Sequence, residues 1–150
     1  MFDWYYNPAQ SKFYFNKIQL AESDDIKSIT PISKDSLIVN DGERLIGYDL
    51  KNGKQFFTTM AEREISTVDA SKQNNKIAYS SFNDLIIQDL MTHEKKVIKS
   101  AHSDKITSIA FCPTKNLIAT ASWDATLKLW NSETGELIAT IIAIGKDDHI

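Results

Sequence analysis

Residues 101–130 read AHSDKITSIAFCPTKNLIATASWDATLKLW, and this stretch decides the fold. It contains three short apolar segments rich in β-branched residues, ITSIAF, LIATAS and TLKLW, and a fourth, ELIATI, follows it. Turn-forming residues separate the segments, as in CPTKN after the first and NSETG after the third. Short runs of this kind bounded by turn residues predict strands, so four consecutive strands are expected here.

Weaker copies of this pattern precede it. The expected first strands begin at Ile26, Ile65 and Ile106, each spaced about 40 residues from the next. The ends of the expected third strands show the same spacing, at Tyr48, Gln88 and Trp130. Two independent sets of anchors therefore give one period, which is typical of a repeat whose unit is a four-stranded sheet.

The unit at residues 101–142 resembles a repeat of the WD-repeat β-propeller family. The resemblance rests on His102 before the first strand, Thr120 in the second, Asp124 in the following turn and Trp130 at the end of the third. It implies that these four residues form a buried tetrad. In that tetrad Asp124 accepts from one imidazole nitrogen of His102, the other nitrogen faces the Thr120 hydroxyl, and Thr120 accepts from the Trp130 indole.

Several positions depart from the family pattern. Ala101 stands where a glycine is usual, and Asn131 replaces the aspartate that gives the family its name. The second unit has Asn83 and Gln88 at tetrad positions and no matching histidine, and the first has Tyr48 in place of tryptophan. These two units are therefore expected to rely on apolar packing.

The expected fold class is all-β, a partial WD-repeat β-propeller of about 3.5 four-stranded blades. We expect one partial propeller over residues 1–150, with a partial blade at 1–22, blades at 23–61, 62–100 and 101–142, and the start of another at 143–150. Within the first piece, a turn is expected at Asn7 to Ala9 and a final strand from Phe13 to Ile18. An open arc leaves apolar sheet faces exposed. The chain is therefore expected to come from a longer propeller, and self-association that closes the ring is the alternative.

The composition narrows the class of partner. The net charge is −3 and only two of the basic residues, Arg44 and Arg63, are arginines, so direct nucleic-acid binding is not expected. A single cysteine excludes an intrachain disulfide. No apolar run reaches the roughly 18 residues of a membrane span, and the start lacks the features of a signal peptide. A cytoplasmic or nuclear location is expected.

The sequence contains residue types that occur in enzymes and in metal sites. His102, Thr120 and Asp124 are the residue types of a catalytic triad, but the repeat explains the same residues as a structural network. No catalytic residue, metal or cofactor is predicted. The histidines and the cysteine have no metal-ligand spacing among them; they are His93, His102, His149 and Cys112.

The candidate partner site is a rim of loops. Trp123 precedes the turn aspartate and has Phe82 as its counterpart in the second unit, and the tetrad requires neither of them. Exposed aromatics beside a basic residue are plausible binding anchors, with packing on a neighbouring blade as the alternative. The full set of predicted contacts is Trp123, Phe82, Lys105, Ser103 and Asp104.

The predicted function is a non-enzymatic protein–protein interaction scaffold within a larger complex. The alternative is a component of a ribonucleoprotein particle of the ribosome-assembly type, acting mainly through protein contacts. That alternative rests on a further resemblance, since degenerate opening blades are also similar to those of WD proteins of the small-subunit ribosome-assembly particle. They are similar as well to WD domains that follow BEACH domains.

Overall fold

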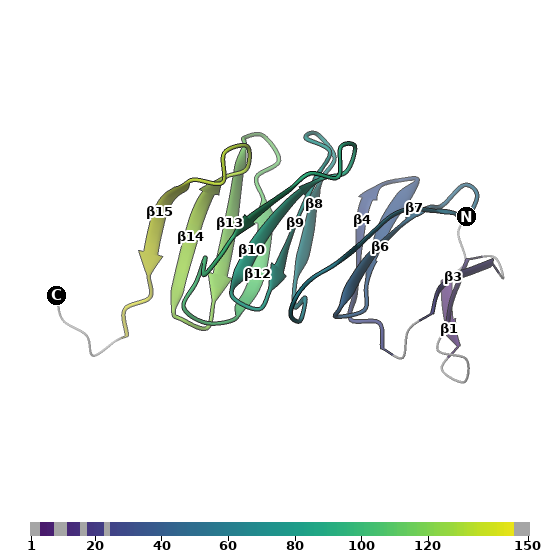
Figure 1. The fold of residues 1–150 in the computed structure, drawn as a ribbon, viewed down its shortest axis with the longest axis horizontal. Coiled ribbons are helices and arrows are strands. Elements are labelled where there is room, and N and C mark those ends of the chain that lie inside the picture. The colour runs from purple at the N-terminus through teal and green to yellow at the C-terminus, as the bar shows by residue number, and fades with distance from the viewer. Residues whose placement is uncertain (1–3, 8–11, 16–17, 23–24, 146–150) are drawn as a thin grey trace.

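The computed structural model describes residues 4–7, 12–15, 18–22 and 25–145, and every regular element in that part of the chain is a strand. Three four-stranded antiparallel sheets follow one another along the chain (Figure 1). The first sheet contains β4 (Ser28–Ser33), β5 (Ser36–Asn40), β6 (Arg44–Asp49) and β7 (Gln55–Met60). The second contains β8 (Val68–Ser71), β9 (Lys76–Ser81), β10 (Asp84–Asp89) and β11 (Lys95–Ile98). The third contains β12 (Ile106–Phe111), β13 (Leu117–Ser122), β14 (Thr126–Asn131) and β15 (Leu137–Ile142).

The expected all-β class and open, partial propeller are confirmed. Each sheet is a meander in which consecutive strands pair, and the stretch that decided the fold forms β12 to β14. The expected fourth strand, ELIATI, is observed one residue later as β15. Short strands joined by tight turns suit the local sequence, because turn-forming residues follow several of the apolar runs, as in Asp41-Gly42 after β5 and Asn52-Gly53 after β6.

The N-terminal piece differs from the expectation. A three-stranded sheet is formed by β1 (Trp4–Asn7), β2 (Lys12–Phe15) and β3 (Ile18–Glu22). The single strand expected from Phe13 to Ile18 is wrong, because Phe15 pairs with Ile18 across an antiparallel ladder and the chain therefore reverses between them. Part of the expected turn, residues 8–9, lies outside the described residues, as do residues 146–150 of the expected next blade.

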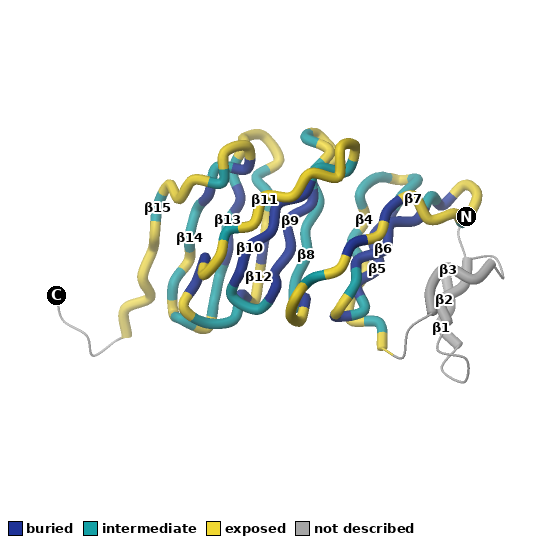
Figure 2. Tube along the Cα trace, in the orientation of Figure 1, coloured by how far each residue is buried: buried dark blue, intermediate teal, exposed yellow. Residues whose placement is uncertain are grey.

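The sheets pack face to face, with the first strands of neighbouring sheets against one another. Side chains alternate between the two faces of a strand, so a sheet buried on both faces needs apolar residues at consecutive positions. In β5, Ile38 packs towards the second sheet while Leu37 and Val39 pack on the opposite face. The second and third sheets share another core, formed by Ala78, Leu85, Ile87, Ala101, Ile106, Ile109, Ile118 and Trp130. Figure 2 shows this burial ending at β15, which is exposed along most of its length.

The links between sheets are hydrogen-bonded to the sheets on both sides. In the link before the second sheet, Ile65 N–H donates to the Gly42 carbonyl of the first sheet at 2.7 Å. The Glu64 carbonyl accepts from Phe82 N–H of the second sheet at 3.0 Å. The next link repeats the pattern with Ile106 to Phe82 at 2.9 Å and Trp123 to Lys105 at 3.0 Å. All these bonds join backbone atoms, and they position the turns after the second strands along one edge of the arc, the lower edge in Figure 1.

In the part of the chain that the structure describes, no helix is long and apolar enough to cross a membrane.

Candidate functional site

The structure brings His102, Thr120, Asp124 and Trp130 together in the third sheet. The Trp130 indole N–H donates to Thr120 Oγ1 at 2.9 Å, and Thr120 Oγ1 lies 2.7 Å from His102 Nε2. His102 Nδ1 lies 2.9 Å from Asp124 Oδ2. The link supplies the histidine, β13 the threonine, the β13–β14 turn the aspartate and β14 the tryptophan. Four segments are thereby joined by one buried chain of polar contacts.

The partners assign a direction to this chain. Asp124 can only accept when ionised, so His102 donates through Nδ1–H, and a neutral imidazole then leaves Nε2 as an acceptor. The Thr120 hydroxyl therefore donates to Nε2 and accepts from Trp130 through the same oxygen. Every donor in the chain has an acceptor, which is the condition for a buried polar network to be stabilising.

Asp124 accepts hydrogen bonds from residues outside the tetrad as well. Ser103 N–H donates to Oδ2 at 3.0 Å, while the Thr126 backbone and hydroxyl donate to Oδ1 at 2.9 and 2.6 Å. Burial alone would raise the pKa of Asp124, but the hydrogen bonds from Thr126, Ser103 and His102 outweigh it and hold this pKa well below its usual range. Sequence reasoning missed Thr126, although an aspartate two residues before a threonine is a familiar turn signal.

The geometry of the tetrad favours a structural role over a catalytic one. A nucleophile must be able to reach a substrate, whereas Thr120 is only 1% exposed and His102 likewise. The Thr120 oxygen is also occupied by an indole donor and an imidazole acceptor. Among the described residues, no group of histidine, cysteine and carboxylate side chains could hold a metal ion.

The second sheet packs through apolar residues on both faces, as expected, and it also has a buried polar arrangement that the sequence did not predict. Asp84, at the start of β10, is buried and accepts from Ser100 N–H at 2.8 Å. Its other oxygen pairs with Arg63 at 3.1 Å and Lys99 at 3.2 Å. Burial raises the pKa of Asp84, but these three partners outweigh it and lower the pKa overall. A buried carboxylate needs such partners, and sequence reasoning had placed the position at Asn83 instead.

The position equivalent to the tryptophan is also polar in the second sheet. Gln88 Oε1 accepts from the Tyr79 hydroxyl at 3.1 Å, and both side chains are buried. Burial raises the pKa of Tyr79, which keeps the phenol protonated as a donor. The amide–phenol pair therefore takes the place of the indole–hydroxyl pair in the third sheet.

The first sheet is built around Asn40, at the end of β5. Its Oδ1 accepts from Gly42 N–H at 2.9 Å, and its Nδ2 donates to the Ile65 carbonyl in the link at 3.2 Å. Tyr48 occupies the tryptophan position, where burial raises its pKa to about 12. Each sheet thus carries its own buried polar group at the same edge.

The rim surface, defined as Trp123, Phe82, Lys105, Ser103 and Asp104, lies at this edge. Trp123 is 68% exposed, and the Lys105 ammonium lies 5.4 Å from its ring centroid while pairing with Glu64 at 2.9 Å. Phe82 is half-buried, and the Arg63 guanidinium lies 5.2 Å from its ring centroid. Two adjacent sheets therefore present an aromatic ring with a cation over it, a favourable arrangement for both groups.

Phe82 has an unusual backbone conformation. Ser81 pairs with Asp84, so Phe82 and Asn83 form a two-residue turn, and Phe82 has φ of 57°. In such turns a positive φ at the first position favours glycine, and a bulky residue there is uncommon. An aromatic held in this conformation is a reason to suspect a role for its ring beyond packing.

The remaining two rim residues are fixed by the link. Ser103 is exposed, but its N–H is one of the donors to Asp124. Asp104 accepts from Lys105 N–H at 2.7 Å through its side chain, and its carbonyl accepts from the Ser122 hydroxyl at 3.1 Å. The structure therefore brings all five candidates to one edge, with Trp123 as the most exposed of their aromatic side chains.

One repeat of the chain matches a known protein family. Residues 94–131 match the family model of the WD domain, G-beta repeat. Over 43 residues the chain is 44% identical to U3 small nucleolar RNA-associated protein 13 of Saccharomyces cerevisiae, covering 29% of this chain and 5% of that protein. It is 43% identical over 44 residues to nuclear distribution protein PAC1 of Coprinopsis cinerea, covering 29% of this chain and 10% of the other.

Solved structures extend the likeness beyond the single repeat. The crystal structure of RRP9 WD40 repeats superposes with a TM-score of 0.72 at 12% identity, over 79% of this chain and 39% of that one. At this identity the likeness concerns the fold. The chain matches only a small part of its curated relatives and less than half of the solved propeller. The repeat match and the relatives identify a WD repeat within residues 94–131, and the solved structures show that the chain has the fold of a WD-repeat β-propeller.

Proposed function

We propose that this chain is a non-enzymatic interaction scaffold whose rim surface contacts a protein partner. The observation that carries the proposal is the exposed Trp123 ring with Lys105 over it, beside the Phe82–Arg63 pair. Exposed aromatics with adjacent cations are typical anchors of protein interfaces, where they bury large area and retain polar contacts. The buried tetrad beneath them holds the turn that presents Trp123.

The proposed scaffold consists of three blades and two partial ones, with one sheet face left exposed. The blades are taken as residues 23–61, 62–100 and 101–142, flanked by partial blades at 1–22 and 143–150. The exposed outer face of the third sheet, which includes Leu127 and Ile141, is proposed to pack against further propeller sequence or against a second chain. Light scattering coupled to size exclusion separates these cases, because two half-rings give a dimer of the 17.0 kDa chain.

The test of the rim proposal is a matched pair of variants in partner capture. Trp123→Ala is expected to reduce the recovery of specific partners at least fivefold while the chain stays folded. Met91→Ala is the control, because Met91 is 74% exposed in the β10–β11 turn at the opposite edge. Equal recovery with both variants would reject the rim as the contact surface.

The second candidate function is membership of a ribonucleoprotein particle, reached through protein contacts. It is favoured by the names of similar proteins, one associated with the U3 small nucleolar RNA. Co-sedimentation with pre-ribosomal particles that is abolished by ribonuclease would favour this candidate. Partner complexes that resist ribonuclease would favour the general scaffold. Either outcome fits a nuclear or cytoplasmic location, which we propose from the same relatives.

A further inference from the structure

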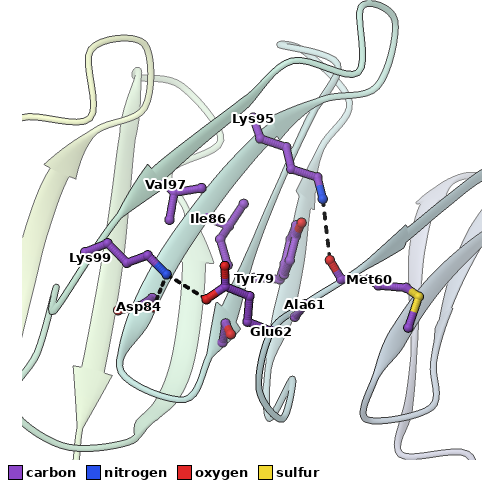
Figure 3. A pocket seen from close by; sticks show the side chains of 10 residues that line it. Met60, Ala61, Glu62, Tyr79, Asp84, Ile86, Lys95, Val97 and Lys99 are labelled. Atoms are coloured by element: carbon purple, nitrogen blue, oxygen red, sulfur yellow. Dashed lines mark hydrogen bonds and ion pairs between the residues drawn. The ribbon is translucent and has the colours of Figure 1, made fainter.

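A cavity of about 220 Å³ lies between the first and second sheets (Figure 3). One wall is the connection from β7 to β8, with Met60, Ala61 and Glu62, and the other is the face of β9 to β11. Ile86 and Tyr79 form a buried floor. The rim proposal uses none of these residues.

The outer wall of this cavity is an unpaired strand edge. β11 pairs with β10 on one side, and among the described residues no strand pairs with its other side. Such an edge presents free backbone N–H and C=O groups in the spacing that a further strand can bond. An extended peptide binds edges of this kind by adding one strand to the sheet.

The charge of this edge sets it apart from the other outer strands. Lys95 and Lys96 begin β11 and Lys99 follows it, whereas β7 (QFFTTM) and β15 (LIATII) contain no charged residue. Lysines on an edge repel a second copy of the same strand, because like charges would lie opposite one another. The same lysines attract a strand that carries carboxylates.

The alternation of side chains directs part of this charge into the cavity. Lys96 points to the third sheet, where its ammonium donates to the Glu133 carbonyl at 2.8 Å. Lys95, Val97 and Lys99 line the cavity instead. Lys99 is held by Asp84 and Glu62, at 3.2 and 2.9 Å. In contrast, Lys95 has no carboxylate partner among the described residues, and its ammonium makes only a 3.4 Å contact with the Met60 carbonyl.

The same face carries an exposed apolar group between the two cations. Val97 is 47% exposed, and on the opposite wall Met60 contributes its carbonyl while its side chain points away from Val97. A strand added to β11 would place one of its side chains directly beside Val97, where pairs of apolar side chains stabilise a sheet. Lys95, Val97 and Lys99 therefore present a cation, an apolar side chain and a second cation at alternate positions.

We propose that β11 and this cavity bind an extended acidic peptide as an additional strand of the second sheet. The segment recognised has carboxylates on alternate positions flanking one apolar residue. The apolar side chain covers Val97, and one carboxylate pairs with Lys95. Backbone hydrogen bonds along β11 supply affinity, and the alternating side chains supply selectivity.

The experiment uses the whole 150-residue chain and a fluorescein-labelled nine-residue peptide. One face of the peptide carries glutamate, leucine and glutamate at alternate positions, and threonine fills the others. Saturable binding by anisotropy is expected, weakened at higher salt because exposed charges are screened. Lys95→Glu is expected to raise Kd at least tenfold and Val97→Asp at least fivefold. Lys115→Glu, the same charge change on the β12–β13 turn, is expected to leave Kd within twofold.

Hydrogen exchange on the unmutated chain gives a second readout that is independent of variant folding. Added peptide is expected to slow exchange at residues 95–99 and to leave residues 103–105 unchanged. Absence of saturable binding, equal binding of a lysine-for-glutamate peptide, or equal Kd for Lys95→Glu and Lys115→Glu would overturn the proposal. A Kd that rises with Trp123→Ala and not with Lys95→Glu would place the peptide on the rim, which overturns this site and leaves the rim proposal standing.

Discussion

The second and third sheets have the same strand order and similar turns, yet they bury different polar groups at the same edge. The third sheet closes a chain from Trp130 to Asp124 inside the protein. The second sheet buries Asp84 beneath two cations whose side chains are partly in water. In this comparison the third sheet has a sealed network, whose side chains are all buried, and the second has an open arrangement, in which the partners of the buried carboxylate are exposed to solvent.

The difference shows that the blade geometry requires a satisfied polar group at this edge, and does not require one particular tetrad. A sealed network loses a full hydrogen bond when one member is removed, because water cannot replace it. An open arrangement lets exposed partners return to solvent at small cost. The two sheets should therefore respond differently to equivalent substitutions.

The largest contrast is expected at the end of the third strands. Trp130→Ala should lower the free energy of unfolding by about 3–5 kcal/mol, since it leaves a cavity in the core shared by two sheets. Gln88→Ala should cost about 1–2 kcal/mol, because the buried Tyr79 hydroxyl loses its 3.1 Å acceptor and keeps only the 3.4 Å contact with Thr59 Oγ1. Urea unfolding followed by circular dichroism measures both. Trp130→Phe keeps most of the packing and isolates the loss of the indole hydrogen bond.

The two buried aspartates give the next contrast. Asp124→Ala is expected to lower the free energy of unfolding by roughly 1–3 kcal/mol, because His102 loses its carboxylate acceptor and keeps only the Thr126 hydroxyl, 3.0 Å from Nδ1. Asp84→Ala should cost less, since Arg63 and Lys99 have side chains 47% and 60% exposed and can rehydrate. A larger loss for Asp84→Ala, measured under the same conditions, would contradict the distinction between a sealed and an open arrangement.

The two buried aspartates also predict how the free energy of unfolding depends on pH. Both aspartates have a folded-state pKa below the ordinary value near 4. Their contribution to stability is therefore complete above that value and is lost as the pH falls towards the folded pKa, where the folded state also binds the proton. Unfolding free energies measured between pH 6 and pH 2.5 should fall with decreasing pH. Asp124→Asn should show a shallower fall, and an unchanged slope would count against the assignment.

The β9–β10 turn holds Phe82 at a positive φ, as the β13–β14 turn holds Ala125, and Phe82 is the bulkier of the two. Phe82→Gly is expected to raise the free energy of unfolding by about 0.5–1 kcal/mol, because glycine accepts the left-handed conformation without penalty. A decrease would show that the ring contributes packing that outweighs the backbone strain. Thermal melts of the variant beside the unmutated chain are sufficient.

The smallest effect is expected for Trp123→Ala, within about 0.5 kcal/mol of the unmutated chain, since substitutions at exposed positions away from the core cost little. Unfolding of this variant at room temperature would identify Trp123 as a packing residue. A stable variant that loses partner contacts would support the rim surface.

The repeat period and strand pattern were sufficient to predict three sheets, because each short run is punctuated locally by turn residues. The tetrad residues could be named only through the family resemblance, and Thr126 was missed because its partner is specified by the turn geometry. Asp84 was missed for a different reason. The second turn is one residue shorter, so the carboxylate moves from the position of Asp124 to the start of β10. The cations that hold it, Arg63 and Lys99, come from two different links, which local sequence does not bring together.

The backbone bonding of the links has a consequence for how such a chain can diverge. Four of the contacts that join one sheet to the next at the rim run from Ile65, Phe82, Ile106 and Trp123 amides to carbonyls, and these four make no demand on side-chain identity. The side chains of Phe82 and Trp123 can therefore be exchanged without breaking these backbone bonds. Selection can change the rim surface one residue at a time while the architecture is inherited unchanged, which is why a shared fold carries little information about function.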